Sequence, residues 1–200
     1  TYPACGCDIP SHLYSFSFEL NPEWSRSFSK QAEILAYMKE CISTYKLDSF
    51  IQYNTEITQL TFDEIGGYWK ISSRNGIDIT AKVVVSATGP LNRPNIPDIP
   101  GKEQFQGPSF HSSKWDSEYS LNGKKVAVIG TGASSIQFVP QIAKEVKELH
   151  IFQRTPPWIV PKPDRKYSRF EKSLFKWIPG YQKLIRNLIY WIQEVGAYAF

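Results

Sequence analysis

The sequence has 200 residues, of which 42% are hydrophobic and 21% are charged, and this balance is typical of a packed globular protein. The length allows one large domain or parts of two. The formal net charge of +4 is mild, and the basic residues are scattered except near the C-terminus. This pattern favours acidic small molecules over nucleic acid as partners, and the sequence has no nucleic-acid-binding motif.

The three cysteines are Cys5, Cys7 and Cys41. Cys5 and Cys7 lack a second cysteine pair and a nearby histidine at zinc-ligand spacing, so we expect no metal site and reduced thiols in a cytoplasmic protein. The sequence shows neither a signal-peptide pattern nor an apolar run of membrane-spanning length. Because it begins at Thr1 and stops inside a helix-like stretch at Phe200, we expect it to be part of a longer protein.

The first half predicts a helix followed by short strands. In residues 29–47 one helical face carries apolar side chains, and Ser29 is placed to be the N-cap. The members of that face are Ile34, Met38, Cys41 and Tyr45. Four β-type runs follow, separated by Gly66-Gly67 and by Asn75-Gly76. They are FIQY at 50–53, EITQLTF at 56–62, YWKIS at 68–72 and IDITAKVVVSATG at 77–89.

Two details of these strands carry further predictions. Asn75-Gly76 predicts a hairpin turn in which both residues have positive φ. Residues 81–87 are apolar after Lys82, which predicts a strand covered on both faces. The proline-rich stretch at 90–101 then predicts a linker.

Residues 124–142 predict a strand, a glycine-rich turn and a helix. The strand is expected to be buried through Val126, Val128 and Ile129. Gly130 permits the tight turn, and Gly132 lets the backbone approach a pyrophosphate at the helix N-terminus. Ser135 occupies the third small position, and the whole context predicts a dinucleotide-binding site. Pro140 predicts a kink. The apolar stripe of this crossover helix is predicted to comprise Ile136, Val139, Ala143, Val146 and Leu149.

The next predicted strand ends just before Arg154 and Thr155. A site for NAD would carry an acidic residue about twenty residues after the glycines, and Arg154 stands there instead. A guanidinium can bind a 2′-phosphate through paired hydrogen bonds, and the Thr155 hydroxyl can add a donor. We therefore predict NADP as the ligand, with a solvated arginine at a strand end as the alternative.

The stretch FQGPSFHSSKWD at 105–116 fits the pattern Phe-x-Gly-x-x-x-His-x-x-x-Trp-Asp. It resembles the fingerprint of the Baeyer–Villiger monooxygenases, which are FAD- and NADPH-dependent flavoproteins. Flavin-containing N- and S-monooxygenases have a related pattern, usually with tyrosine or phenylalanine in place of Trp115. The same resemblance includes YPACGCDIPSHLYSFSFE at 2–19, Ala87-Thr88-Gly89, the GxGxSS loop and FQRTP at 152–156.

This resemblance implies an α/β fold with two Rossmann-like dinucleotide-binding domains in series, FAD first and NADPH second. Residues 1–95 would be a partial FAD-binding domain with a small β-meander and without its glycine loop. Residues 96–122 would be the linker with the fingerprint, and residues 123–160 the NADP-binding unit. Residues 161–200 would begin a helical insertion. The basic, aromatic tail at 168–200 also allows peripheral contact with a membrane surface through an amphipathic helix.

The resemblance also implies roles for individual residues. Asp8 would lie beside the flavin ring and the nicotinamide as a buried carboxylate, paired with an arginine from outside this sequence; from the residues alone it could be an N-cap or a surface acid. His111 could be a general base, but we favour a hydrogen-bonded residue of the linker, with Trp115 as the linker's anchor. Asp8 and His111 are thus the candidate catalytic residues. The implied cofactor contacts are Gly6, Cys7, Asp8, Tyr14, Ile57, Gly130, Thr131, Gly132, Ala133, Ser134, Ser135, Ile136, Gln137, Arg154 and Thr155.

Among these contacts, Tyr14 and Ile57 are assigned to FAD, whereas Gly6 and Cys7 are assigned to the nicotinamide end of NADP. Gly6 stands where many Baeyer–Villiger enzymes have arginine, which leaves open whether the substrate is a ketone.

The activity implied by the resemblance is that of a flavin-dependent monooxygenase. NADPH would reduce FAD, and a flavin C4a-peroxide formed with O2 would insert one oxygen atom beside a ketone carbonyl. Oxygenation of a nitrogen or sulfur atom, a flavoprotein NADPH reductase and a non-catalytic nucleotide-binding remnant are the alternatives. We expect that the 200 residues alone do not retain FAD, and the oligomeric state is left open.

Overall fold

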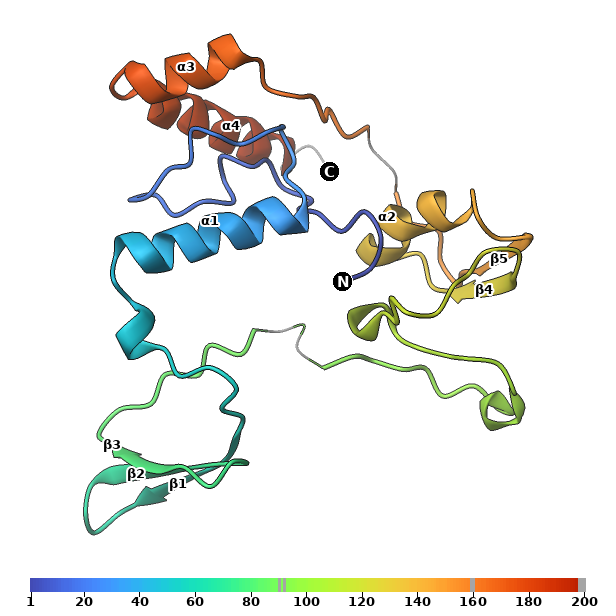
Figure 1. Cartoon of the computed structure of the whole chain (residues 1–200), viewed down its shortest axis with the longest axis horizontal. Helices are drawn as coiled ribbons and strands as arrows, with labels where there is room; N and C mark the ends of the chain where they lie inside the picture. The colour runs from blue at the N-terminus through green and yellow to red at the C-terminus, as the bar shows by residue number, and fades with distance from the viewer. Residues whose placement is uncertain (90, 92, 159–160, 198–200) are drawn as a thin grey trace. The chain divides into compact units, whose positions relative to one another are not determined.

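The computed structural model describes residues 1–89, 91, 93–158 and 161–197. The chain divides into two compact units: Thr1–Cys41 with Asp98–Phe200 form the first, and Ile42–Pro97 form the second. The order of the elements is shown in Figure 1. The architecture is a mixture of helices and strands, as the sequence predicts.

The second unit contains the predicted β-meander. Its strands are β1 (Ile57–Asp63), β2 (Tyr68–Ser73) and β3 (Asp78–Ala81), which pair antiparallel in the order β1-β2-β3. At the turn between β1 and β2, Gly67 has φ +65°, and its N–H donates to the Asp63 carbonyl at 2.8 Å. The glycine pair there provides the left-handed residue that this turn requires.

The second hairpin forms at the predicted place but with a different turn. Gly76 has φ +79°, whereas Asn75 does not have a positive φ, so the turn has one left-handed residue instead of two. The Ser73 hydroxyl accepts from the N–H of Ile77 at 2.9 Å, and the Ser73 N–H donates to the Ile77 carbonyl at 3.1 Å. This pairing lengthens the loop to three residues, for which a single left-handed glycine is sufficient.

One predicted strand of this unit is absent, and another is shorter than predicted. Residues 50–53 do not form a strand, because a short 3-10 helix (Asp48–Phe50) occupies their start and a turn begins at Tyr53. The predicted strand at 81–87 stops at Ala81, and Val83 and Val85 beyond it are exposed. A strand covered on both faces needs neighbours for its backbone groups, and none of the described strands pairs with residues 82–89.

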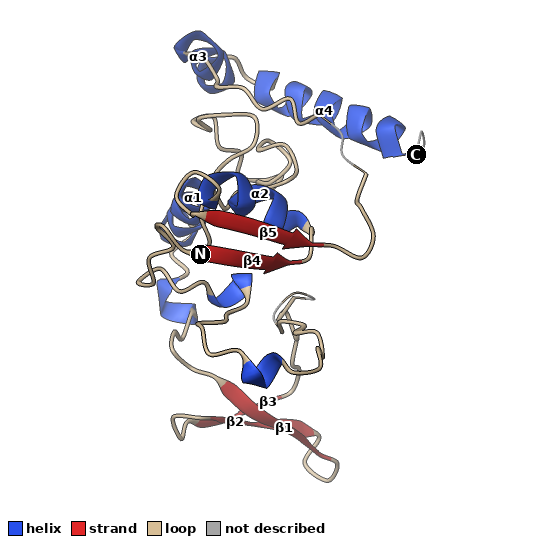
Figure 2. Ribbon diagram, turned by 90° about the vertical axis from the view of Figure 1, so that its right-hand side faces the viewer, coloured by secondary structure: helices blue, strands red, loops and turns tan. Residues whose placement is uncertain are grey.

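The first unit contains the predicted strand–helix–strand motif. Its elements are β4 (Lys125–Ile129), α2 (Ala133–Ile142) and β5 (Glu148–Phe152). The two strands are parallel, and the arrows in Figure 2 point the same way. Parallel pairing places the carboxyl ends of both strands at one edge of the sheet. Val128, Phe138 and Ile142 form the buried core between the strands and α2.

The buried face of α2 agrees only in part with the predicted apolar stripe, of which Val139, Val146 and Leu149 pack against the core. Its buried residues are Ser135, Phe138 and Ile142, whereas Ile136 is exposed. The helix ends at Ile142, two residues after Pro140, so the predicted stripe continues past the helix. In β4 as well, Val128 is buried as predicted but Ile129 is 61% exposed. The sequence pattern predicted the helix and the strand, but not which of their side chains neighbouring elements bury.

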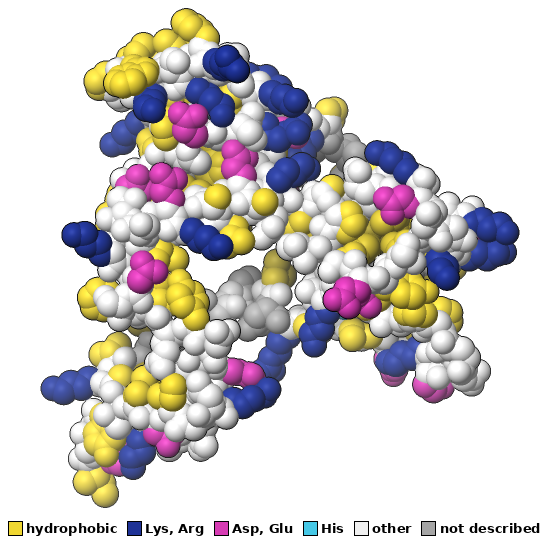
Figure 3. Space-filling view, viewed as in Figure 1, with side chains coloured by type: hydrophobic (Ala, Val, Ile, Leu, Met, Phe, Trp, Pro, Cys, Tyr) yellow, Lys and Arg dark blue, Asp and Glu magenta, His cyan; other side chains and the backbone are white. Residues whose placement is uncertain are grey.

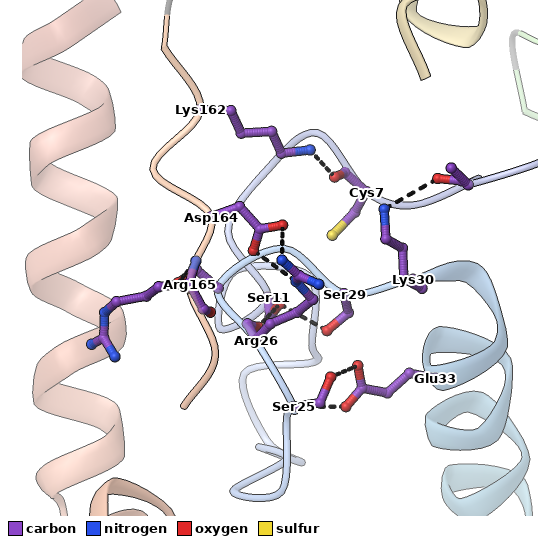
Figure 4. Close-up of polar contacts among 12 residues, drawn as sticks. Cys7, Ser11, Ser25, Arg26, Ser29, Lys30, Glu33, Lys162, Asp164 and Arg165 are labelled. Atoms are coloured by element: carbon purple, nitrogen blue, oxygen red, sulfur yellow. Dashed lines mark hydrogen bonds and ion pairs between the residues drawn. The ribbon is translucent and has the colours of Figure 1, made fainter. Parts of the chain in front are cut away.

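The first unit also contains α1 (Gln31–Thr44) and the N-terminal loop. α1 begins at Gln31, so Lys30 and not Ser29 stands directly before the helix at the N-cap position. The buried Ser29 hydroxyl instead forms a hydrogen bond of 2.8 Å with the Ser11 hydroxyl. Both residues are labelled in Figure 4. The apolar core here consists of Trp24, Tyr37 and Cys41, with Ile34 and Tyr167 packed against it. Of the face predicted for this helix, Met38 is exposed and Tyr45 is exposed beyond the helix end.

The segment before α3 pairs with the N-terminal loop. Ser27 N–H donates to the Arg165 carbonyl at 2.9 Å, and Tyr167 N–H donates to the Ser25 carbonyl at 3.0 Å. Beside this pairing, Arg26 forms a two-pronged ion pair with Asp164, with N···O distances of 2.8 and 2.9 Å (Figure 4). Residues 164–167 and residues 25–27 are thus joined by hydrogen bonds and an ion pair, although they are far apart in the sequence.

Two helices complete the first unit, α3 (Arg169–Trp177) and α4 (Tyr181–Ala197). Ser168 caps α3 through a capping box with Glu171. Figure 3 shows lysine and arginine side chains beside hydrophobic ones over these helices. Within the described residues, no helix combines the length and the apolar character needed to cross a membrane.

Candidate functional site

The glycine loop follows β4 directly and is closed by its own residues. Gly130 has φ +101°, a conformation that side chains disfavour, so this position requires glycine. The Ser135 hydroxyl donates to the Gly130 carbonyl at 2.8 Å and is buried beneath the loop. Ser135 at the third small position therefore stabilises the turn with a hydrogen bond that neither glycine nor alanine could make.

The helix end above this loop is open. Gly132 is the N-cap of α2, and its cap position makes no side-chain hydrogen bond. A Cβ atom placed on Gly130 or on Gly132 would meet nothing within 4 Å among the described residues. Unpaired N–H groups and the helix dipole attract anions, so an open helix N-terminus with a glycine approach fits a dinucleotide's diphosphate. The loop and the first turn bring together the predicted contacts Gly130, Thr131, Gly132, Ala133, Ser134, Ser135 and Ile136.

Arg154 and Thr155 lie at the same sheet edge as the glycine loop. They follow the end of β5 at Phe152, and the register pairs Phe152 with Ile129, the last residue of β4. Arg154 is exposed and forms no ion pair with another described residue. A free guanidinium beside a diphosphate site fits an additional phosphate group. The described residues at this edge therefore fit NADP.

The N-terminal segment carrying Asp8 reaches α2. The Gln137 side chain accepts a hydrogen bond from the Gly6 N–H at 3.0 Å and donates one to the Gly6 carbonyl at 3.1 Å. The sequence predicts a nucleotide contact for Gln137. Its hydrogen bonds to Gly6 could not be predicted, because no sequence motif indicates them. Cys7 is held in the same way: its N–H donates to the Ser29 carbonyl at 2.9 Å, and its carbonyl accepts from Lys162 Nζ at 2.8 Å (Figure 4).

Three of the predicted site residues line one pocket. Gly6, Cys7 and Tyr14 border it on one side, together with Cys5. Its remaining wall belongs to α1 and consists of Gln31, Ile34, Leu35 and Met38. Leu35 and Met38 are both exposed, and both line this pocket. Ile57, the other residue assigned to FAD, begins β1 in the second unit.

Asp8 itself is exposed, directly after the buried Cys7. It forms no ion pair with another described residue. The structure thus differs from a buried carboxylate with a neighbouring cation, because the described chain places neither a cover nor a cation on Asp8. Backbone bonds fix the two residues before it, while its carboxylate is free to meet a partner.

His111 and Trp115 have structural contacts. His111 Nδ1 accepts from the Ser113 N–H at 3.1 Å and caps a short 3-10 helix (Ser112–Lys114). The Trp115 ring packs 5.0 Å from the Phe138 ring, measured between centroids, and so attaches this stretch to the core of α2. Both side chains therefore make structural contacts in the described chain, and their roles in a linker stay predictions.

Comparison with known proteins places this geometry in a family. Residues 11–174 match the sequence profile of the pyridine nucleotide-disulphide oxidoreductases. The chain belongs to this family. It is 51% identical over 199 residues to a Baeyer-Villiger monooxygenase of Pseudomonas aeruginosa; the match covers all of this chain and 38% of that protein. The chain therefore spans well under half the length of this relative.

Solved structures give the same picture. Cyclohexanone monooxygenase from Rhodococcus sp. Phi1 bound to NADP⁺ superposes with a TM-score of 0.78 at 34% identity, over 88% of this chain and 34% of that one. OTEMO in complex with FAD and NADP superposes with a TM-score of 0.80 at 33% identity, over 97% of this chain and 37% of that one. These likenesses confirm the resemblance to Baeyer–Villiger monooxygenases that the motifs indicate.

The name of the pyridine nucleotide-disulphide oxidoreductase family refers to a disulfide, but the cysteines of this chain form none. Cys5, Cys7 and Cys41 are free thiols. Burial raises the pKa of the Cys7 thiol, although the hydrogen bond with Ser29 and the charge of Lys162 act in the opposite direction. A raised thiol pKa and a buried side chain both disfavour thiolate chemistry at Cys7.

One buried residue near the site was missed by sequence reasoning. His12, four residues after Asp8, is fully buried between the rings of Tyr167 and Phe175. Its Nδ1 lies 3.3 Å from Gln182 Nε2, and its Nε2 has no hydrogen-bond partner among the described residues. Burial lowers the pKa of His12 to about 4. His12 therefore joins the Asp8 segment to α3 and α4 as a neutral imidazole.

Proposed function

We propose that the protein containing this chain is an FAD- and NADPH-dependent monooxygenase that transfers one oxygen atom of O2 to a ketone in a Baeyer–Villiger oxidation. The observation that carries the proposal is the pairing of an open glycine loop with Arg154 at one sheet edge, in a chain of this family. Its similarity to Baeyer-Villiger and cyclohexanone monooxygenases supports the reaction type.

The roles of the chain's own residues follow from their positions. The N–H groups at the start of α2 bind the diphosphate of NADPH, and Arg154 and Thr155 bind its 2′-phosphate. Residues 1–95 contribute to the FAD site. Tyr14, assigned to FAD, lines the same pocket as Gly6 and Cys7, which are assigned to the nicotinamide. When bound, NADPH supplies the hydride and FAD supplies the centre that reacts with dioxygen.

Asp8 orients the reacting end of the site. Its carboxylate is exposed on a backbone that is fixed by the hydrogen bonds to Gly6 and Cys7. A carboxylate in this position raises the pKa of a cation that approaches it, and thereby keeps the cation charged to stabilise a developing anion. His111 holds the linker through its cap on residues 112–114 and takes no proton in this scheme.

A flavoprotein NADPH reductase would share the nucleotide-binding residues. Such an enzyme normally transfers electrons to a redox cysteine pair near the flavin. The raised pKa of Cys7 and its burial disfavour thiolate chemistry here. Oxygenation of a sulfur or nitrogen atom is the stronger alternative, since Gly6 stands where many Baeyer–Villiger enzymes have arginine and the described residues that line the pocket include no arginine.

Isotopically labelled dioxygen tests the proposal on the full-length protein. We expect NADPH oxidation that depends on a cyclic ketone and a lactone product carrying one labelled oxygen atom. A matched cyclic sulfide provides the comparison. Labelled sulfoxide without lactone would assign the enzyme to heteroatom oxygenation, and NADPH oxidation without label in any organic product would contradict the proposal.

A further inference from the structure

The backbone of Gly6 and Cys7 is bound by three other segments of the chain. Both polar groups of Gly6 are bonded to the Gln137 side chain of α2. The N–H of Cys7 is bonded to Ser29, and its carbonyl to Lys162. All four backbone polar groups of this dipeptide therefore have a partner more than twenty residues away in the sequence. Because every backbone polar group of the dipeptide is hydrogen-bonded, Gly6 and Cys7 have little freedom to move.

Gln137 stands on the helix that carries the diphosphate site. The candidate diphosphate ligands are the N–H groups of Ala133–Ser135, and Gln137 follows them within the first turns of α2. Its amide oxygen and one of its amide N–H groups are used on Gly6. The side chain is thus turned toward the N-terminal segment, where the Tyr2 hydroxyl also lies 3.5 Å from Oε1.

Glycine is needed at position 6 for this contact. A Cβ atom there would lie 2.9 Å from the Ser29 carbonyl oxygen and 3.2 Å from Lys30 Cδ. Gly6 also forms an isolated antiparallel bridge with Lys30. A side chain at this position would push the segment away from Ser29 and Lys30 and change its approach to Gln137. The hydrogen bonds between Gly6 and the Gln137 amide therefore depend on the absence of a side chain at position 6.

We propose that Gln137 is a positioning residue: it fixes Gly6 to α2 and so holds Asp8 at a set place relative to the nucleotide loop. This inference rests on the proposed function, because it assumes that NADPH occupies that loop. On this view Gln137 acts through the backbone of the Asp8 segment and not through contact with the nucleotide. Loss of the clamp disorders Asp8 while the diphosphate site stays intact.

The variant Gln137→Leu tests the proposal in the full-length protein, because leucine keeps the size of the side chain and removes both hydrogen bonds. Gln141→Leu is the matched control: it lies one turn later on α2, and its amide is bonded only to Lys144 among the described residues. Hydrogen exchange reports the Gly6 amide directly. Two lost hydrogen bonds predict faster exchange at Gly6, by roughly tenfold or more, in Gln137→Leu alone.

Two further readouts separate positioning from nucleotide contact. The dissociation constant of NADP⁺ should change by less than about threefold in Gln137→Leu, since no bond to the nucleotide is lost. The yield of oxygenated product per NADPH oxidised should fall, with hydrogen peroxide released instead. A loss of NADP⁺ affinity of about tenfold with unchanged exchange at Gly6 would overturn the proposal and make Gln137 a nucleotide ligand.

A second variant covers the case in which Gln137→Leu does not fold. Gln137→Glu keeps the acceptor for the Gly6 N–H but loses the donor to its carbonyl, so intermediate protection at Gly6 and a lower yield of oxygenated product are expected; wild-type protection together with a wild-type yield would contradict the clamp. If the wild-type protein binds no NADP⁺, the proposed function fails. The exchange comparison between the Gln137 and Gln141 variants still decides whether the clamp exists.

Discussion

The backbone N–H of Gly130 donates a hydrogen bond of 2.8 Å to the carbonyl of Phe152. This bond extends the parallel pairing of β4 and β5 by one step, from the strands into the glycine loop. It ties the start of the diphosphate site to the strand end that precedes Arg154. The glycine loop and the segment that carries Arg154 are therefore joined by a backbone hydrogen bond that does not depend on their side chains.

Stability should fall in mild acid because of His12. Burial lowers the pKa of His12 to about 4 in the folded protein, whereas the unfolded chain has the ordinary value of about 6.5. The unfolded state therefore binds more protons between these values, so folding stability is complete above pH 6.5 and decreases as the pH falls toward 4. The largest loss from this one group is about 3 kcal/mol.

Chemical denaturation of the full-length protein between pH 4 and pH 7 measures this effect. His12→Gln should flatten the dependence over that window, although it lowers stability at pH 7 by loss of packing. His150→Gln is the control, because His150 is exposed on β5. An unchanged slope in His12→Gln would show that other groups cause the acid sensitivity.

The capping box of α3 should contribute measurably to stability. The Ser168 hydroxyl accepts from the Glu171 N–H, and the hydrogen bonds to Arg165 and Ser168 lower the pKa of Glu171 to about 2. Ser168→Ala is expected to cost about 1 kcal/mol in unfolding free energy, as measured by denaturation. Ser173→Ala, in the middle of the same helix, should cost little or nothing; an equal loss in both variants would argue against the cap.

Glu171 also predicts an acid limb of its own. Its pKa is lowered in the folded state, so its contribution is present above the ordinary pKa of about 4.5 and disappears as the pH falls toward 2. Glu171→Gln should remove this part of the acid sensitivity. Titration of the Glu171 carboxyl by NMR gives the folded pKa directly, and a value near 4.5 would contradict the contacts with Arg165 and Ser168.

Lys162 should control the reactivity of the Cys7 thiol. Its Nζ donates to the Cys7 carbonyl at 2.8 Å, and its charge lowers a thiol pKa that burial raises. Lys162→Met should therefore raise the Cys7 pKa further and slow its alkylation at a given pH. The rate is followed by mass spectrometry across a pH series. Lys166→Met is the control, and equal slowing in both variants would refute a local effect.

The sequence is sufficient for the elements around the nucleotide loop because local signals agree there. The glycines at 130 and 132, the strand before them and the helix after them each favour the same structure, and β4, α2 and β5 form as predicted. Residues 81–87 show the opposite case. Their apolar character predicts a buried strand, but strand formation depends on partners that a local pattern does not contain, and Val83 and Val85 are exposed.

The candidate site is less accessible to sequence reasoning. Gly6 and Gln137 are 131 residues apart, and their contact depends on an amide meeting a backbone, for which no motif exists. His12 lies inside a recognised motif, yet its burial is decided by Tyr167 and Phe175 from the far end of the chain. Residue types identified candidates such as Asp8, while the contacts that fix them in space required the fold.

The cofactor preference of Arg154 variants tests the central claim most directly. Arg154→Glu in the full-length protein replaces the guanidinium expected to bind the 2′-phosphate with a repelling charge, and Arg169→Glu on α3 makes the same charge change away from the sheet edge. Loss of a charge-assisted pair predicts a fall of roughly 10- to 100-fold in kcat/KM for NADPH relative to NADH in Arg154→Glu alone. An NADPH-to-NADH preference that equals that of the wild type would contradict the account.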